Sequence, residues 1–308
     1  MLIGEPNSFI YLYCVLVLIL FVSGVGLGIC KRILEQFSLV SPTDSNSQHS
    51  NLISNINARG LRLILACRSK DKATNAIHEL KTHLNEVLIS RSSNGNVNNF
   101  ISLLELQFEC LDLSSVESCK IFSDNLRSKY KSLSSIICNA GNGSFTGIDW
   151  ISAIKQVVLH PVDGLTYPNY KLQSKGEKTD DNLGWVFQTN IFGHFVLIKE
   201  LQSLLEAEFN SYGTQSSVLW MSSLEAGKFD YDISDFQLLN NDKSYECSKY
   251  LTEALAIGLN DYYSSRGLHI TSYIVHPGVV WSSIFYQHLG WILDLCMAFA
   301  FYLVSYAF

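Results

Sequence analysis

The chain has 308 residues, of which 47% are hydrophobic and only 16% charged, and its formal net charge is −6. This length suits one large α/β domain or two small ones, and the low charged fraction indicates a buried sheet, membrane contact or both. An acidic balance without a basic run argues against nucleic-acid binding. We expect no zinc site and no disulfide framework, because no Cys-x-x-Cys pair occurs among the eight cysteines, at 14, 30, 67, 110, 119, 138, 247 and 296.

Residues 9–22 form an apolar run with three possible structures: a membrane anchor, the core of a signal peptide, or the first buried strand of a parallel sheet. The run is short for a bilayer span, which needs about 20 residues. Gly24, Gly26 and Gly28 follow at once, and glycines let a backbone approach a pyrophosphate at a helix N-terminus. We therefore predict a strand within 9–22, a phosphate-binding turn at these glycines and a helix over 29–37. A glycine-rich turn after an apolar helix is the alternative.

After a polar loop over 41–57, residues 61–68 have the pattern of a short buried strand that ends in a cation, Arg68. In dinucleotide-binding folds an acidic residue at this place binds the ribose 2′-hydroxyl, whereas arginine accommodates a 2′-phosphate. Arg68 therefore favours NADP(H) over NAD(H), with Ser69 and Lys70 within reach of the same phosphate. The alternative is a solvated arginine at a strand end.

The alternation of strands and helices continues beyond Arg68. We predict a helix over 70–88, a strand over 103–113, a helix over 116–130 and a strand over 133–138. This order is typical of a doubly wound parallel sheet with its ligand at the carboxyl ends of the strands, where Asp112 would lie beside an adenine pocket. The predicted fold is a Rossmann-like α/β domain over 1–288, flanked by apolar N- and C-terminal segments.

Tyr245 and Lys249 stand four positions apart in a stretch, 245–259, whose apolar spacing predicts a helix. Positions four apart share one helix face. A phenol has an ordinary pKa of about 10, and a nearby ammonium favours the phenolate and lowers that pKa. A tyrosine tuned in this way can protonate a carbonyl oxygen as hydride reaches the carbon. Taken alone, the pair also fits a packing tyrosine and a solvated lysine.

With Asn139-Ala140-Gly141, Ser222-Ser223, Tyr245-x-x-x-Lys249 and His276-Pro277-Gly278 in this order, the chain resembles the short-chain dehydrogenase/reductase family. The resemblance implies that Tyr245 is the proton donor and that Lys249 lowers its pKa and contacts the nicotinamide ribose. It also implies that a serine of the pair, Ser223 rather than Ser222, hydrogen-bonds the substrate carbonyl.

Further site residues follow from the same resemblance. Asn190 matches the helix asparagine that holds a proton-relay water, and Val280 and Ser282 match positions that contact the carboxamide end of the nicotinamide. The full set expected to bind the cofactor is Gly24, Gly26, Leu27, Gly28, Arg68, Asp112, Asn139, Tyr245, Lys249, Val280 and Ser282.

Two long spacings narrow the resemblance to the 3-keto sterol reductases of fungal ergosterol synthesis. Asn190 lies 51 positions after Asn139, about twice the family spacing, which places an insert at 142–185, and the spacing from Ser223 to Tyr245 is also long. This likeness implies NADPH-dependent reduction of the 3-keto group of C-4 demethylated sterols to the 3β-hydroxy group. It also implies a cytosol-facing site at the endoplasmic reticulum membrane and lipid droplets, with the other C-4 demethylation enzymes and oxidosqualene cyclase as partners.

The chain departs from the family at both ends. Phe21 and Val22 stand where the family turn begins with Thr-Gly, and the chain ends about 30 residues after Pro277-Gly278, where the family usually continues. These departures leave two alternatives open. One is a catalytically impaired scaffold member of the sterol C-4 demethylation complex, and the other is a reductase of a different apolar carbonyl, such as a retinoid or a fatty acyl derivative.

Residues 289–308 are apolar or aromatic almost throughout, apart from Asp294. Twenty residues are long enough to span a bilayer, but a carboxylate near the centre costs a few kcal/mol there. An interfacial helix or a lid over a sterol pocket are the alternatives, and we expect membrane contact of some kind.

Overall fold

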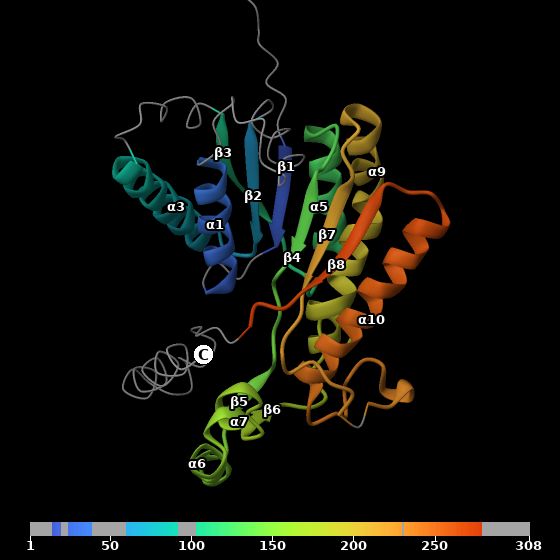
Figure 1. The fold of residues 1–308 in the computed structure, drawn as a ribbon. Coiled ribbons are helices and arrows are strands. Elements are labelled where there is room, and N and C mark those ends of the chain that lie inside the picture. The colour runs from blue at the N-terminus through green and yellow to red at the C-terminus, as the bar shows by residue number, and fades with distance from the viewer. Residues whose placement is uncertain (1–13, 20–23, 39–59, 92–102, 230, 279–308) are drawn as a thin grey trace, which may run out of the picture.

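The computed structural model describes residues 14–19, 24–38, 60–91, 103–229 and 231–278. Its centre is a six-stranded parallel sheet in the order β3-β2-β1-β4-β7-β8 (Figure 1). The strands are β1 (Cys14–Ile19), β2 (Leu61–Cys67), β3 (Leu104–Cys110), β4 (Ser135–Cys138), β7 (Ser216–Met221) and β8 (Ile270–Val275). The strand order reverses between β1 and β4, so the predicted doubly wound fold is confirmed.

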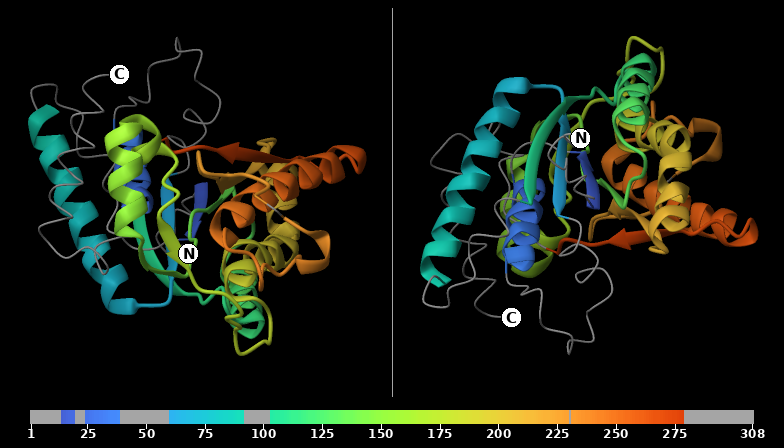
Figure 2. Two further views of the ribbon diagram at one scale, coloured as in Figure 1. Left: turned by 90° about the horizontal axis from the view of Figure 1, so that it is seen from below. Right: turned by 90° about the horizontal axis from the view of Figure 1, so that it is seen from above.

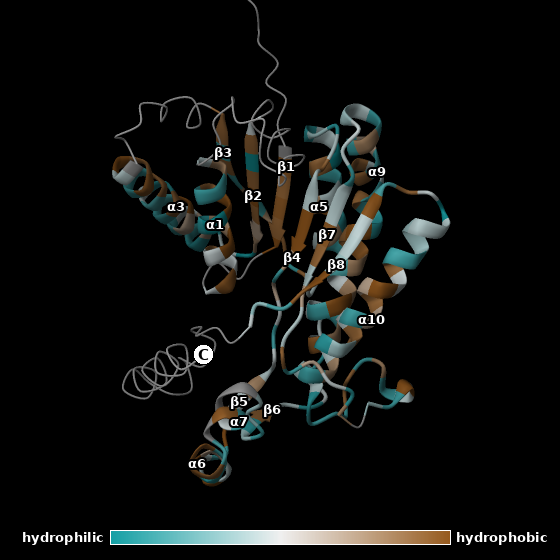
Figure 3. Ribbon diagram, in the orientation of Figure 1, coloured by the Kyte–Doolittle hydropathy of each residue, from teal (hydrophilic) through white to brown (hydrophobic). Residues whose placement is uncertain are grey.

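Helices cover both faces of this sheet (Figure 2). The helices α1 (Val25–Ser38) and α3 (Lys70–Arg91) pack on one face, and α5 (Val116–Lys129), α9 (Gly193–Tyr212) and α10 (Ser244–Ser265) pack on the other. A strand covered on both faces needs apolar side chains on both, and hydrophobic residues run along β1, β2 and β4 (Figure 3). The core therefore consists of two apolar layers, one on each side of the sheet.

The apolar run near the N-terminus contributes the central strand. Val17 and Leu18 of β1 are fully buried, and β1 pairs in parallel with both β2 and β4. Within the described residues, the run is therefore a strand of the sheet, as one of its three interpretations predicted. Phe21 and Val22 lie outside the described residues.

The glycines after β1 do not form the predicted turn. Gly24 has a φ of +62° and precedes α1, which begins at Val25. Gly26 and Gly28 lie inside the helix, where the Gly28 N–H donates to the Gly24 carbonyl at 3.1 Å. The prediction of a turn at all three glycines is therefore wrong, because the helix begins four positions earlier than residue 29.

Most of the cysteines in the described residues are core residues. Cys30, Cys67, Cys119, Cys138 and Cys247 are buried. Cys110 is the exception: it is exposed at the end of the edge strand β3, where the sheet has no further neighbour.

The insert over 142–185 folds as a small unit beyond the carboxyl ends of the sheet strands (Figure 1). Two short antiparallel strands, β5 (Phe145–Ile148) and β6 (Lys171–Gln173), enclose the helices α6 (Trp150–Leu159) and α7 (Pro161–Thr166). The chain re-enters the sheet domain through α8 (Trp185–Phe187) and a π-helical turn, Gln188–Phe192.

No helix within the described ranges combines the length and the hydropathy needed to cross a bilayer. The apolar segment 289–308 lies outside those ranges, so its predicted membrane contact stays a prediction.

Candidate active site

Tyr245 and Lys249 lie in the first two turns of α10, whose N-terminal end faces the insert. Lys249 is buried, and its ammonium donates to the Met221 carbonyl at 2.8 Å. Its Nζ lies 5.8 Å from the centre of the Tyr245 ring. Burial lowers the Lys249 pKa to about 8, so this lysine can lose its proton at mildly alkaline pH.

The electrostatics of Tyr245 differ from the prediction that Lys249 lowers its pKa. Burial raises the pKa of the phenol, the carboxylate of Glu225 raises it further, and a hydrogen bond with Ser223 opposes both effects. The Lys249 ammonium is directed to the Met221 carbonyl instead. In this structure, the surroundings of Tyr245 therefore favour a protonated phenol.

The two adjacent serines point to different partners. Ser223 hydrogen-bonds Tyr245 and accepts from the Glu225 backbone N–H at 3.2 Å. Ser222 is buried, and its hydroxyl donates to the Glu253 carboxylate at 2.5 Å. The structure therefore brings Ser223, and not Ser222, to the tyrosine; that Ser223 binds the substrate carbonyl stays a prediction.

Asn190 lies in the π-helical turn before α9, and such turns are frequent at functional sites. Its side chain bonds both backbone groups of Asn142, accepting from the N–H at 2.6 Å and donating to the carbonyl at 2.8 Å. It also donates to the Ser248 hydroxyl at 2.9 Å. Sequence reasoning missed Asn142 and Ser248, although one follows the Asn-Ala-Gly motif and the other precedes Lys249.

Gly141, of the Asn139-Ala140-Gly141 motif, lies close to both Lys249 and Asn190. A Cβ at this glycine would lie 3.3 Å from the Lys249 ammonium and 3.4 Å from the Asn190 side-chain oxygen. The backbone after β4 therefore passes directly over both residues, and a side chain there would crowd them.

A cavity of about 130 Å³ opens at the carboxyl ends of β1, β2 and β4, and Gly141 forms part of its wall. Arg68 and Asp112, both predicted to bind a cofactor, line this cavity together with Ser69 and Lys72. Lys72, and not the predicted Lys70, is the lysine of the first turn of α3 that lines this cavity. The Asp112 carboxylate accepts from the backbone N–H and the hydroxyl of Ser114 at 2.9 and 2.6 Å.

Other predicted cofactor residues are not among those that line this cavity. Among the described residues that line it, none belongs to the set Gly24, Gly26, Leu27, Gly28 and Asn139. Val280 and Ser282 lie outside the described residues. The roles of all these residues stay predictions.

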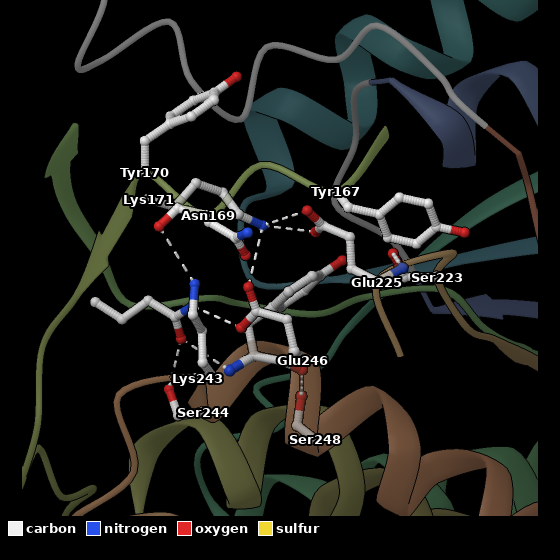
Figure 4. A network of polar contacts seen from close by, with 12 residues as sticks. Tyr167, Asn169, Tyr170, Lys171, Ser223, Glu225, Lys243, Ser244, Glu246 and Ser248 are labelled. Carbon is white, nitrogen blue, oxygen red and sulfur yellow. Dashed lines mark hydrogen bonds and ion pairs between the residues drawn. The ribbon is translucent and has the colours of Figure 1, made fainter. Parts of the chain in front are cut away.

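A buried group of charges, Lys171, Glu225 and Glu246 in Figure 4, lies close to Tyr245, whose ring centre is 5.3 Å from the Lys171 Nζ. Lys171 of β6 pairs with Glu225, which follows β7, and with Glu246 of α10. Sequence reasoning missed this group because its members are far apart in the chain and only the packing of the insert on α10 brings them together.

The chain matches no protein-family model. It is 30% identical to the 3-keto-steroid reductase of Eremothecium gossypii over 286 residues, which are 93% of this chain and 72% of that protein. It is 30% identical to the 3-keto-steroid reductase of Schizosaccharomyces pombe over 283 residues, or 91% and 72%.

The fold also matches solved structures. The RhlG/NADP active-site complex of Pseudomonas aeruginosa superimposes with a TM-score of 0.53 and 16% sequence identity, covering 89% of this chain and 75% of that one. At this level of identity the match supports the doubly wound fold.

Proposed function

Because the chain belongs to the 3-keto-steroid reductase family, within the short-chain dehydrogenases/reductases, we propose that it reduces the 3-keto group of C-4 demethylated sterols to the 3β-hydroxy group with NADPH. The observation that carries this proposal is the meeting of Tyr245, Ser223 and Lys249 next to a cavity at the carboxyl ends of the strands. This is the edge at which doubly wound sheets bind ligands.

The residues around the cavity fit a nicotinamide dinucleotide phosphate. Arg68, Lys72 and the hydroxyl of Ser69 line one end, and two cations with a hydroxyl donor suit a 2′-phosphate. The absent side chain of Gly141 leaves the approach to Lys249 and Asn190 open. Bound there, the reduced nicotinamide would supply the hydride.

Side chains of this protein would protonate the oxygen of the ketone and hydrogen-bond to it. Tyr245, whose phenol is kept protonated, gives its proton to that oxygen, and Ser223 donates a hydrogen bond to it. Lys249 and Asn190 hold the surrounding backbone through Met221 and Asn142. Without a proton donor the reduction would leave an alkoxide, so we expect Tyr245 to contribute a large part of the rate.

The test is conversion of a 4-demethylated 3-keto sterol by the detergent-solubilised full-length protein, with NADPH and NADH in parallel and the sterol product identified by mass spectrometry. We expect the 3β-hydroxy sterol, faster with NADPH, and a loss of about 10²–10⁴ in kcat for Tyr245→Phe. A Tyr245→Phe protein with full turnover would refute the assignment of the proton donor.

The same assay separates the competing functions. NADPH binding without sterol turnover would favour the scaffold function. Faster turnover of a retinoid or fatty acyl carbonyl than of the sterol would favour a different substrate class.

We also propose that the enzyme works on the cytosolic face of the endoplasmic reticulum membrane and of lipid droplets, next to the other C-4 demethylation enzymes and oxidosqualene cyclase. Support comes from α6, whose large apolar residues face outward: Ile151, Ile154 and Val158 are 70%, 62% and 73% exposed. Its inward face carries the buried Ala153 and the amide of Gln156.

The chemistry of α6 favours a lipid surface. Gln156 donates to the Tyr167 carbonyl and accepts from the Asn169 N–H, both at 2.9 Å, so polar contacts hold the helix to the insert. The helix α6 lies at the lower end of the molecule in Figure 1, and Trp150 is exposed on it together with the three apolar residues. Apolar helix faces with aromatic residues are typical of membrane interfaces, and a sterol substrate resides in lipid.

Flotation with phosphatidylcholine vesicles tests this surface. We expect the triple variant Ile151→Ser, Ile154→Ser, Val158→Ser to bind vesicles less than the wild type. The matched control replaces exposed isoleucines on α3, α5 and α10 by serine, at Ile89, Ile121 and Ile257. Equal loss of binding in both triple variants would contradict a specific role of α6.

A further inference from the structure

The strand β6 of the insert lies against the first turn of α10, the helix that carries Tyr245. The side chain of Lys171 is 2% exposed, and its Nζ lies 2.6 and 2.7 Å from the two carboxylate oxygens of Glu225 and 3.4 Å from an oxygen of Glu246 (Figure 4). The same Nζ lies 5.3 Å from the centre of the Tyr245 ring and 5.0 Å from that of Phe145. A residue of the insert thus supplies a buried cation directly beside the tyrosine.

Gln173, two positions further along β6, bonds the start of the same helix. Its side-chain oxygen accepts from the Tyr245 backbone N–H and from the Ser244 hydroxyl, both at 2.9 Å, and its amide donates to Glu246 at 2.7 Å. The first N–H groups of a helix have no partner within the helix. The Lys243 side chain at the N-cap makes no capping hydrogen bond, so Gln173 supplies an acceptor that the helix start lacks.

We propose that β6 is a positioning element for the reaction, in which Gln173 fixes the backbone of Tyr245 and Lys171 neutralises the carboxylates of Glu225 and Glu246 beside the phenol. The catalytic part of this inference rests on the proposed function. Both residues act through Tyr245 or its neighbours and are positioning residues.

Charge balance explains why a lysine is needed there. Charged groups reach the surroundings of Tyr245 from the following places: Lys171 from β6, Glu225 from the loop after β7, Lys243 from the N-cap position before α10, and Glu246 and Lys249 from α10 itself. Burial raises the Glu225 pKa and the ammonium of Lys171 lowers it, so Lys171 helps to keep this carboxylate ionised. Without Lys171, an ionised Glu225 next to the phenol would lack its directly paired cation and would make Tyr245 a weaker acid.

The pH dependence of kcat for sterol reduction distinguishes this role from simple attachment of the insert. The reaction needs a protonated phenol, so the rate falls as pH rises through the Tyr245 pKa in the complex. We expect Lys171→Met to lower kcat about 10-fold or more and to move this alkaline limb to higher pH, because it raises that pKa. Glu225→Gln should move the limb to lower pH, and the double variant should lie closer to the wild type than Lys171→Met does.

Lys175→Met is the matched control. Lys175 forms an exposed ion pair with Asp242 at 2.6 Å, which also joins the insert to the segment before α10. We expect an unchanged pH profile for this variant. An unmoved alkaline limb in Lys171→Met, or a double variant no better than Lys171→Met, would overturn the electrostatic part of the proposal.

Hydrogen exchange of the peptide over 244–248 tests the backbone part without any turnover. Gln173→Leu should speed exchange at the start of α10, whereas Lys175→Met should not. Unchanged exchange in Gln173→Leu would overturn the capping role. A wild type that exchanges as expected but reduces no sterol would instead contradict the proposed function, so the two failures are distinct.

Discussion

The alanine variants of Ser222 and Ser223 should affect different properties, stability in the first and catalysis in the second, because the two hydroxyls point to different partners. We expect Ser223→Ala to lower kcat about 10²-fold, because the substrate oxygen loses a hydrogen-bond donor, with little change in the free energy of unfolding. Ser222→Ala removes one of two partners of the Glu253 carboxylate, which His276 also contacts at 3.1 Å, and should cost about 0.5–1.5 kcal/mol of stability with kcat nearly unchanged. Steady-state kinetics and urea unfolding of both variants measure kcat and the free energy of unfolding. If instead Ser222→Ala lost activity and Ser223→Ala lost stability, the contact with the substrate carbonyl would belong to Ser222.

The buried Lys249 should make the free energy of unfolding depend on pH. Its folded pKa of about 8 lies below the ordinary 10.5, so between these values the unfolded chain binds a proton that the native protein does not. The free energy of unfolding therefore gains from this group as pH rises from about 8 to 10.5, by about 3 kcal/mol in all. Urea unfolding of the wild type and of Lys249→Met at several pH values measures this effect as the difference between their free energies of unfolding. A difference that does not change with pH would contradict a buried lysine.

The positions of single site residues could be predicted from the sequence, but their electrostatic surroundings could not. The spacing of Tyr245 and Lys249 correctly predicted a shared helix face, and the strand end at Arg68 correctly predicted its place at a cavity. The direction of the Tyr245 pKa was wrong, because it depends on burial and on Glu225. Neither local spacing nor composition reveals a carboxylate that tertiary packing brings to the phenol.

At the scale of elements, the start of α9 depends on one glycine. A Cβ at Gly193 would lie 2.5 Å from the Leu113 carbonyl oxygen, a backbone atom that cannot easily move. We expect Gly193→Ala to lower the free energy of unfolding by about 1–3 kcal/mol and to reduce kcat, because Asn190 lies in the preceding turn.

Gly258 provides the control within another helix. It lies in α10 with open space where a Cβ would be, so Gly258→Ala should gain about 0.5–1 kcal/mol from helix propensity. Urea unfolding of the two variants compares them directly. Equal effects would show that the contact with Leu113 is unimportant.

Elements of the sheet domain were predictable and those of the insert were not. The predicted strand over 61–68 is β2 (Leu61–Cys67), because a buried parallel strand needs a continuous apolar run. The strands β5 and β6 are only four and three residues long and mix polar with apolar side chains. The spacing of motifs located the insert, but its strands have no periodicity from which to predict them.

At the scale of the whole molecule, the reversal of strand order brings the residues of the candidate active site together at the carboxyl ends of the strands. The end of β1 and the loops after β2, β3 and β4 line the cavity, while the loop after β7 brings Ser223 and Glu225 to the first turn of α10. The insert packs on that turn through β6 and exposes α6 on its outer side. One small unit thus connects the tyrosine to the surface that we propose contacts lipid.

The transfer of deuterium tests the central claim most directly. The protein would be given NADPH that carries deuterium at both C4 positions of the nicotinamide and a 4-demethylated 3-keto sterol, and the sterol product analysed by mass spectrometry and NMR. The account predicts a 3β-hydroxy sterol with one deuterium at C3, formed by the wild type and nearly lost in Tyr245→Phe. A protein that binds NADPH but leaves the 3-keto sterol unlabelled and unreduced would contradict it.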